Sequence, residues 1–398
     1  MAIFNNQFKK KIKISMFKFN GWIDSKIFKL LEALENRKPE KKRFYLRPDE
    51  GKVQFIPQGQ RGANFPQINL RMERYLTLMI TEKCNLRCAY CLRDTQGGKG
   101  KEIPFPILKR ILLSAHRFGI KSFSITGGEP LMYSHWEELI KLIGFLKSSV
   151  FVETNGSFLK EDNLKFLENT LENRIDKVLI SLDNYKAEAN DRFRGQGTFS
   201  SAVKAIELLH SHNIPIEINA ILTPFNLTEE KEILNYIKFG KELGVEEIVL
   251  GEVVGLGRGK NSKFLLTENQ RRQISQILSK YNYFREERGV KIRCGPFQEV
   301  VNLQPCYRLG REIAVSPYGL HPCIFNIDTL KIGDFEDFEK LLYSEFLNSL
   351  YWVGAAMQES FKKQVFFSCS KCVEYLPHWL SLIKKDTSFN PKQNYEKN

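Results

Sequence analysis

The middle of the chain alternates between two hydrophobic repeats. Short runs of apolar or alternating residues predict strands, and longer stretches with apolar positions three and four residues apart predict helices. Strands are expected at 75–81, 122–126, 149–153, 176–182, 215–222 and 245–251. Helices are expected at 104–118, 139–146, 161–171, 199–209 and 228–243. This order predicts an α/β fold of parallel strands joined by right-handed helical crossovers, and six such units are too few to close an eight-unit barrel.

The pattern changes on both sides of this region. Residues 1–74 form a lysine-rich extension, with a helix expected at 22–36 and a strand at 52–57, and they suggest no function. The barrel is expected to span 75–290. A second domain is placed at 291–383, where short segments carry the other five cysteines, and residues 384–398 form a polar tail that we expect to be disordered.

Composition narrows the function classes. The net charge is +14, but the lysines are spread widely and no nucleic-acid-binding motif is present, so a solvated basic surface is expected rather than a nucleic-acid partner. No apolar run has the length of a membrane span, and Lys18 interrupts the one hydrophobic stretch near the N-terminus. Closely spaced cysteines favour metal binding over disulfides, which predicts a reducing, cytoplasmic location.

Three closely spaced cysteines follow the first strand. Cys84, Cys88 and Cys91 are separated by three residues and then two. A structural zinc site needs four ligands, as does a four-iron cluster with every iron bound by protein. Three thiolates would leave one iron open to a small molecule, which marks a reactive metal site. The alternative is three buried cysteines, or a zinc site completed by a distant fourth ligand.

This spacing, with Tyr90 before the third cysteine, closely resembles that of the radical S-adenosylmethionine (SAM) superfamily. The resemblance implies a partial (β/α)6 barrel and a 4Fe-4S cluster whose open iron binds SAM. It also implies reductive cleavage of SAM to a 5′-deoxyadenosyl radical, which abstracts a substrate hydrogen. A low-potential electron donor of the ferredoxin or flavodoxin type would supply the electron.

Polar motifs are expected at the carboxyl ends of the strands, where α/β barrels gather their chemistry. The resemblance implies that several of them bind SAM. Gly127-Gly128-Glu129-Pro130 would hold its amino group and Arg194 its carboxylate, with Arg192 as the competing choice. The other expected SAM contacts are Tyr90, Asn155, Ser181, Asp183 and Leu222, although Leu222 is equally a candidate core residue. The glycine-rich loop 255–259 is expected to face SAM or substrate.

A second cysteine set follows in the C-terminal part. A hairpin is expected from 311–315 and 320–324, which would bring Cys306 and Cys323 together. Cys369 and Cys372 add a further pair, and four thiolates saturate a metal. The arrangement resembles the Twitch domain, a short form of the SPASM extension, and so implies one auxiliary 4Fe-4S cluster. Structural zinc is the alternative, and Cys294 is a spare thiol or a replacement ligand.

The expected function is that of a radical SAM oxidoreductase or maturase that modifies a peptide or protein by crosslinking or oxidation. The second reading is the same chemistry on a small molecule, such as a dehydrogenation in antibiotic or cofactor biosynthesis. A third reading is a non-catalytic iron–sulfur electron carrier or binding protein. It leaves the glycine motif and Arg194 without a role.

Overall fold

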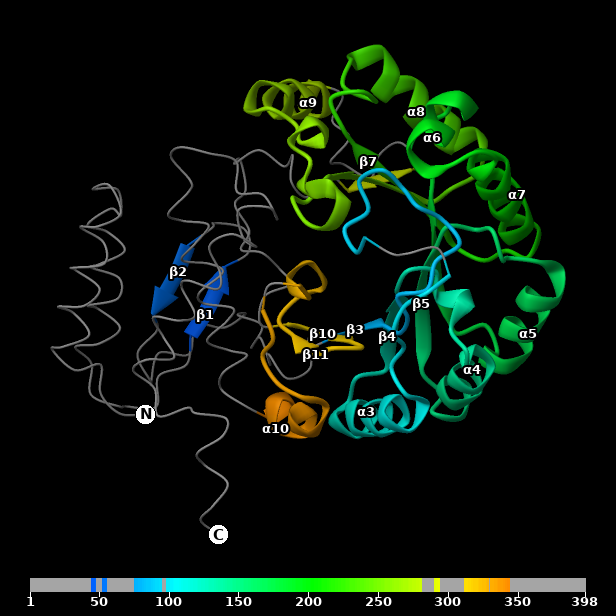
Figure 1. The fold of residues 1–398 in the computed structure, drawn as a ribbon, viewed down its shortest axis with the longest axis vertical. Coiled ribbons are helices and arrows are strands. Elements are labelled where there is room, and N and C mark those ends of the chain that lie inside the picture. The colour runs from blue at the N-terminus through cyan, green and yellow to red at the C-terminus, as the bar shows by residue number, and fades with distance from the viewer. Residues whose placement is uncertain are drawn as a thin grey trace, which may run out of the picture.

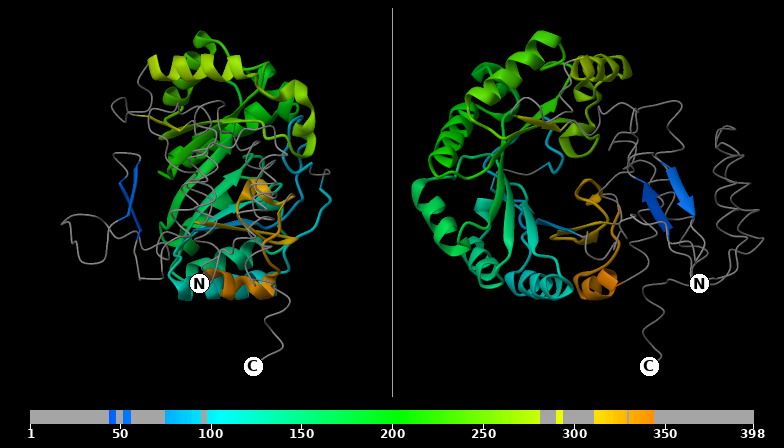
Figure 2. Two further views of the ribbon diagram at one scale, coloured as in Figure 1. Left: turned by 90° about the vertical axis from the view of Figure 1, so that its left-hand side faces the viewer. Right: turned by 180° about the vertical axis from the view of Figure 1, so that it is seen from behind.

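A nine-stranded sheet forms the frame of the protein. We analysed a computed structural model, which describes residues 44–47, 52–55, 75–94, 98–280, 290–293, 311–328 and 330–343. The strand order is β11-β10-β3-β4-β5-β6-β7-β8-β9. Its strands are β3 (Tyr75–Met79), β4 (Ser122–Thr126), β5 (Ser149–Thr154), β6 (Ile175–Ser181), β7 (Ile216–Leu222), β8 (Glu247–Glu252), β9 (Lys291–Arg293), β10 (Glu312–Ser316) and β11 (Gly319–His321). Figures 1 and 2 show this sheet curving into an open barrel.

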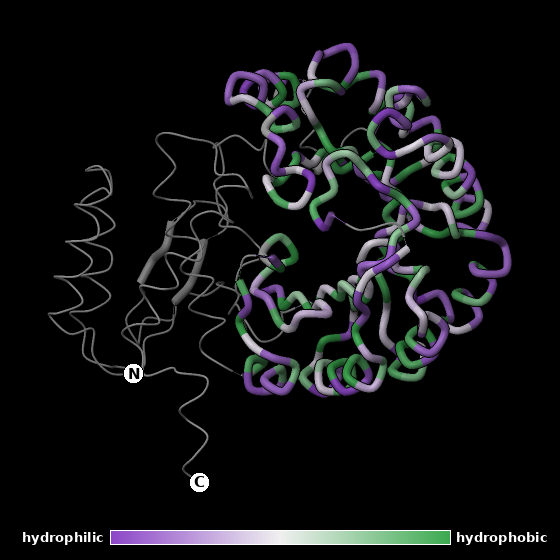
Figure 3. The backbone as a smooth tube through the Cα atoms, in the orientation of Figure 1, coloured by the Kyte–Doolittle hydropathy of each residue, from purple (hydrophilic) through white to green (hydrophobic). Residues whose placement is uncertain are grey.

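Helices cover the outer face of the barrel (Figure 1). They are α3 (Phe105–Phe118), α4 (Trp136–Phe145), α5 (Glu161–Leu171), α6 (Ala187–Arg194), α7 (Thr198–Ser211), α8 (Glu230–Glu242), α9 (Glu268–Lys280) and α10 (Phe338–Tyr343). Figure 3 shows hydrophilic residues along their outer sides. The main core lies between the helices and the sheet, where for example Phe123, Ile140 and Leu164 are fully buried.

The six predicted strands form β3 to β8, and neighbouring strands pair in parallel. The predicted α/β partial barrel is therefore confirmed. The five predicted helices form α3, α4, α5, α7 and α8. Three helices of the described residues were not expected, namely α6, α9 and α10. The buried positions Ile274, Ile277 and Leu278 of α9 repeat at helical spacing and were a signal that sequence reasoning missed.

Both edges of the barrel sheet come from the region that the sequence assigns to a second domain. β9 pairs in parallel with β8 at one edge, and β10 pairs in parallel with β3 at the other. β11 pairs antiparallel with β10, so the predicted hairpin is present. β9, β10 and β11 thus belong to the same sheet as β3 to β8. The domain boundary expected after residue 290 stays a prediction.

Two short strands lie outside the nine-stranded sheet. β1 (Phe44–Arg47) and β2 (Lys52–Phe55) form a separate antiparallel pair. The helix expected at 22–36, the tail 384–398 and most of the N-terminal extension lie outside the described residues. Within the described ranges, no helix combines the length and apolarity needed to cross a bilayer.

Candidate active site

A cavity of ≈ 220 Å³ lies at the carboxyl ends of the barrel strands. Its walls come from the loop after β3 and from the ends of β4 to β8. Residues lining it include Cys84, Cys88, Tyr90, Cys91, Gly127, Gly128, Asn155, Ser181, Arg194, Asn219, Ile221, Glu252 and Phe325. This is the end of an α/β barrel where catalytic groups gather. Many of the residues singled out in the sequence are thus brought to one place.

The three cysteines after β3 face this cavity together. The pKa of the Cys84 thiol is raised to about 11, mainly by burial; the neighbouring Glu129, Cys88 and Cys91 act in the same direction, and the hydrogen bond from the Leu86 amide acts against it. Burial also raises the pKa of Cys88. The thiols of Cys84 and Cys88 therefore stay protonated at neutral pH unless a bound metal stabilises the thiolates.

The glycine motif after β4 packs directly on the cysteine loop. The Gly128 amide donates to the Thr81 carbonyl at 2.7 Å, and the Glu129 amide donates to the Lys83 carbonyl at 2.8 Å. A Cβ atom on Gly127 would lie 2.6 Å from the Thr81 carbonyl oxygen, and one on Gly128 would clash with the backbone of Lys83. The glycines therefore position the cysteine loop as well as line the cavity.

Gly128→Ala should lower the free energy of unfolding of the metal-free protein by about 1–3 kcal/mol, because the backbone of Glu82 and Lys83 must move to admit the methyl group. Chemical denaturation measures this. Gly255→Ala is the matched control, since a Cβ at Gly255 meets nothing within 4 Å and this glycine has no positive φ. Equal stability of the two variants would contradict the packing role of Gly128.

Glu129 links two loops rather than lining the cavity. Its fully buried carboxylate accepts hydrogen bonds from the Thr154 hydroxyl at 2.7 Å and the Asn155 amide at 2.9 Å. Burial raises the pKa of Glu129 to about 7, although these hydrogen bonds act against the rise. Pro130 begins the short helix η1 (Pro130–Met132) and is also buried. Asn155 does face the cavity, and its side-chain amide donates to Asn85 at 2.9 Å.

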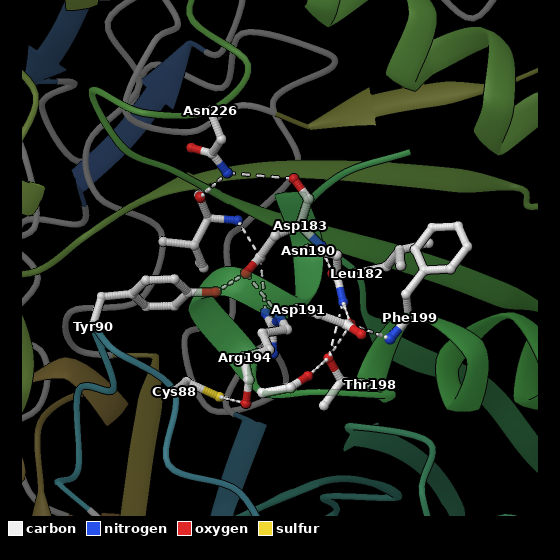
Figure 4. A network of polar contacts seen from close by, with 12 residues as sticks. Cys88, Tyr90, Leu182, Asp183, Asn190, Asp191, Arg194, Thr198, Phe199 and Asn226 are labelled. Carbon is white, nitrogen blue, oxygen red and sulfur yellow. Dashed lines mark hydrogen bonds and ion pairs between the residues drawn. The ribbon is translucent and has the colours of Figure 1, made fainter. Parts of the chain in front are cut away.

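Arg194 is held by a buried carboxylate (Figure 4). Its Nε and Nη2 donate to the two oxygens of Asp183 at 2.8 and 2.9 Å. Burial would lower the pKa of Arg194, but the charges of Asp183 and Cys88 and the hydrogen bonds raise it above its ordinary value. The Tyr90 hydroxyl and the Ile221 amide also donate to Asp183. This carboxylate therefore fixes the guanidinium at the cavity wall.

Two residues predicted to contact SAM do not line the cavity. Ser181, the last residue of β6, lines it, whereas Asp183 lies beyond the end of the strand and is fully buried. On β7, Leu222 is fully buried in the main core, whereas its neighbour Ile221 lines the cavity. Successive side chains of a strand point to opposite faces, so Leu222 is the core residue that the sequence left as the alternative. Arg192, the competitor of Arg194, is exposed and lies 5.8 Å from the Phe193 ring centroid.

The cavity has further polar walls that sequence reasoning missed. Glu252, the last residue of β8, lines it and accepts from Arg271 of α9 at 2.7 Å. Asn219 of β7 also lines it. Both follow the rule that barrel chemistry gathers toward the strand ends, so their positions on the predicted strands were an available signal.

The loop 255–259 packs on the cysteine loop. A Cβ on Gly257 would lie 2.5 Å from the carbonyl oxygens of Cys91 and Leu92. The Arg258 amide donates to the Cys91 carbonyl at 2.9 Å, and its Nε donates to the Cys88 carbonyl at 2.8 Å. The loop therefore supports the backbone that carries the cysteines.

One predicted auxiliary ligand is described. Cys323 follows β11 and is buried with 4% of its surface exposed. The other predicted auxiliary ligands, Cys306, Cys369 and Cys372, lie outside the described residues, as does the spare Cys294. The proposed four-cysteine set thus stays a prediction.

The fold and the cavity together define a partial α/β barrel with three thiols at its mouth. Residues 78–239 match the Radical SAM superfamily. Residues 78–239 therefore carry a Radical SAM domain, and the predicted resemblance to this superfamily is confirmed.

Two relatives differ in what their names state. The chain is 23% identical over 288 residues to the antilisterial bacteriocin subtilosin biosynthesis protein AlbA of Bacillus subtilis, with 71% of this chain and 62% of that protein covered. It is 32% identical over 195 residues to a GTP 3′,8-cyclase of Clostridium perfringens, with 48% and 58% covered. The chain therefore covers less than two thirds of the length of either relative.

Solved structures share the fold. Native anSMEcpe with bound AdoMet superposes with a TM-score of 0.57 at 18% identity, over 78% of this chain and 99% of that one. SuiB of Streptococcus suis bound to its precursor peptide SuiA superposes with a TM-score of 0.56 at 16% identity, over 85% and 80%.

The three cysteine thiols on the cavity wall fit a four-iron cluster. Within the part of the chain that the structure describes, no three His, Cys, Asp or Glu side chains converge as ligands of one ion do. The protein ligands of a four-iron cluster bind different irons, so their sulfurs stand around a larger body. Three thiols on the wall of one cavity match that requirement.

Proposed function

We propose that this protein cleaves SAM reductively and uses the resulting radical to modify a peptide. The observation that carries the proposal is that Cys84, Cys88 and Cys91 share one cavity with the glycine motif and Arg194. The three cysteines would hold a 4Fe-4S cluster with one open iron. When bound, the cluster supplies the electron that splits the sulfonium of SAM.

The protein's own residues would bind and orient SAM. The Gly127-Gly128 backbone lines the cavity beside the cysteines, where it can approach the methionyl group closely. Asp183 engages Nε and Nη2 of Arg194, which leaves Nη1 to meet a ligand carboxylate. Ser181 and Ile221, on neighbouring strands, would offer a hydroxyl and an apolar surface to the adenosyl part of SAM.

The peptide substrate is supported by two relatives. AlbA takes part in the biosynthesis of subtilosin, a bacteriocin, and SuiB has been solved with its precursor peptide. The likeness to GTP 3′,8-cyclase favours the second candidate, a small-molecule substrate, since its identity over the matched residues is higher. An auxiliary 4Fe-4S cluster held by Cys323 and the three undescribed cysteines would accept or relay electrons in either case.

Anaerobic reconstitution tests the proposal. The full chain, incubated with iron and sulfide, should bind about eight irons, from two four-iron clusters. With SAM and a strong reductant it should release 5′-deoxyadenosine. Binding of only four irons per chain would contradict the proposed auxiliary cluster. Absence of 5′-deoxyadenosine at full iron loading would support the non-catalytic electron carrier instead.

Substrate class is tested with deuterium. Peptides encoded beside the gene are offered in deuterated form, and deuterium transferred into 5′-deoxyadenosine identifies the hydrogen donor. Transfer from a peptide supports the first candidate. Transfer from GTP or another small molecule, with none from the peptides, would overturn it.

A further inference from the structure

Arg93 joins the cysteine loop to the segment that carries Cys323. It lies two residues after Cys91, and its side chain is 7% exposed. Nη1 donates to Asp328 at 3.1 Å, and Nη2 donates to the carbonyl of Ile324, the residue after Cys323. One guanidinium thus lies beside two cysteines that are predicted to bind different clusters.

Other contacts hold the two segments in the same register. The Tyr318 hydroxyl, in the hairpin turn, donates to Glu82 at 2.8 Å, just before the cysteine triad. After the triad, Leu92 and Phe325 pack against the same apolar pair, Val254 and Leu256. The hairpin segment therefore contacts the cysteine loop before the triad and shares an apolar cluster with it after the triad.

Because Arg93 is buried, little water screens its positive charge from the groups around it. Burial lowers the pKa of Arg93, while the charges of Asp328, Cys91 and Cys323 raise it and so identify its electrostatic neighbours. Asp328 is 44% exposed and is therefore partly screened by water. A buried cation with a partly screened partner keeps a net positive field in its surroundings.

We propose that Arg93 is a positioning residue that holds a positive charge beside the cysteine triad and raises the reduction potential of the cluster bound there. This inference rests on the proposed function, because it requires a cluster at Cys84, Cys88 and Cys91. Adding one electron to a cluster makes its charge more negative. A nearby cation therefore stabilises the reduced form, and net charge is one of the factors that set such potentials.

A redox titration of the reconstituted full chain, followed by electron paramagnetic resonance, tests this role. Arg93→Gln should shift the reduction equilibrium about tenfold toward the oxidised form, which is 59 mV more negative for a one-electron couple. Asp328→Asn should shift it the opposite way, because it removes the negative partner and leaves Arg93. Arg93→Lys keeps the charge and should remain near the unmodified protein.

Arg117→Gln is the matched control, since it removes an exposed guanidinium in the last turn of α3 that pairs with Glu339 at 3.3 Å. It should leave the potential unchanged. Shifts of the same sign in Arg93→Gln and Asp328→Asn, or equal shifts in Arg93→Gln and Arg93→Lys, would overturn the electrostatic role and leave a structural tether. If Arg93→Gln loses iron, the Asp328→Asn variant decides whether the role is electrostatic. A less negative reduction potential in that variant supports the role, and a more negative one overturns it.

Failure of this inference is distinct from failure of the proposed function. The unmodified protein is assayed in parallel for iron and for 5′-deoxyadenosine. If the unmodified protein cleaves SAM but the substitutions at Arg93 and Asp328 leave the reduction potential unchanged, only the role of Arg93 is overturned. A protein without SAM cleavage overturns the proposed function whatever its potentials do.

Discussion

Replacing Cys84, Cys88 and Cys91 together with alanine should abolish the release of 5′-deoxyadenosine and leave about half of the iron of the reconstituted protein. The three thiols line one cavity, and under the proposed function they are the protein ligands of the SAM-binding cluster. Without them that cluster would have no attachment, while the proposed auxiliary cluster would keep the four cysteines predicted for it. Iron analysis and chromatography of the reaction products measure both effects.

Cys323→Ala is the matched control for this experiment. It removes one buried thiol from the segment after β11 and leaves the triad intact. It should lose auxiliary iron and retain SAM cleavage. A triple variant that still cleaves SAM would show that the reactive cluster is held elsewhere.

Asp183→Asn should lower the free energy of unfolding of the metal-free protein by about 3 kcal/mol or more. Asp183 is fully buried and accepts two hydrogen bonds from the guanidinium of Arg194, so its neutralisation leaves a buried cation without its counter-charge. The Ile221 amide also loses its bond to a charged acceptor. Denaturant unfolding, followed by circular dichroism, measures the change.

The control for Asp183 is an exposed ion pair. Glu137→Gln on α4 breaks a pair with Lys141 at 3.2 Å whose side chains are 66% and 60% exposed. Exposed helical pairs contribute about 0.3–0.5 kcal/mol. If the two variants unfold at the same denaturant concentration, Asp183 does not hold Arg194 in the way that the structure indicates.

Periodicity predicted the barrel because parallel strands and their crossover helices bury different faces at different spacings. The six strands lie within a few residues of their predicted ranges. β9 and β10 were assigned to another domain because strand pairing between residues far apart in the chain leaves no local signal. The partner of β10 is β3, more than 200 residues earlier in the chain.

The candidate site followed from the sequence only in part. Short motifs located the cysteines, the glycine motif and Arg194, since these residues lie close together in the chain. The choice between Leu222 and Ile221 depends on which side of β7 faces the cavity, and a hydrophobic strand buried on both faces does not reveal it. The bond of Asp183 to Arg194 depends on how α6 folds back after β6.

The central claim is that one iron of the cluster on Cys84, Cys88 and Cys91 is open to SAM. Electron paramagnetic resonance of the reduced protein, recorded with and without SAM, tests this most directly. We expect added SAM to change the signal of one cluster, and that signal to be missing from the triple alanine variant. A spectrum that is the same with and without SAM would contradict the account.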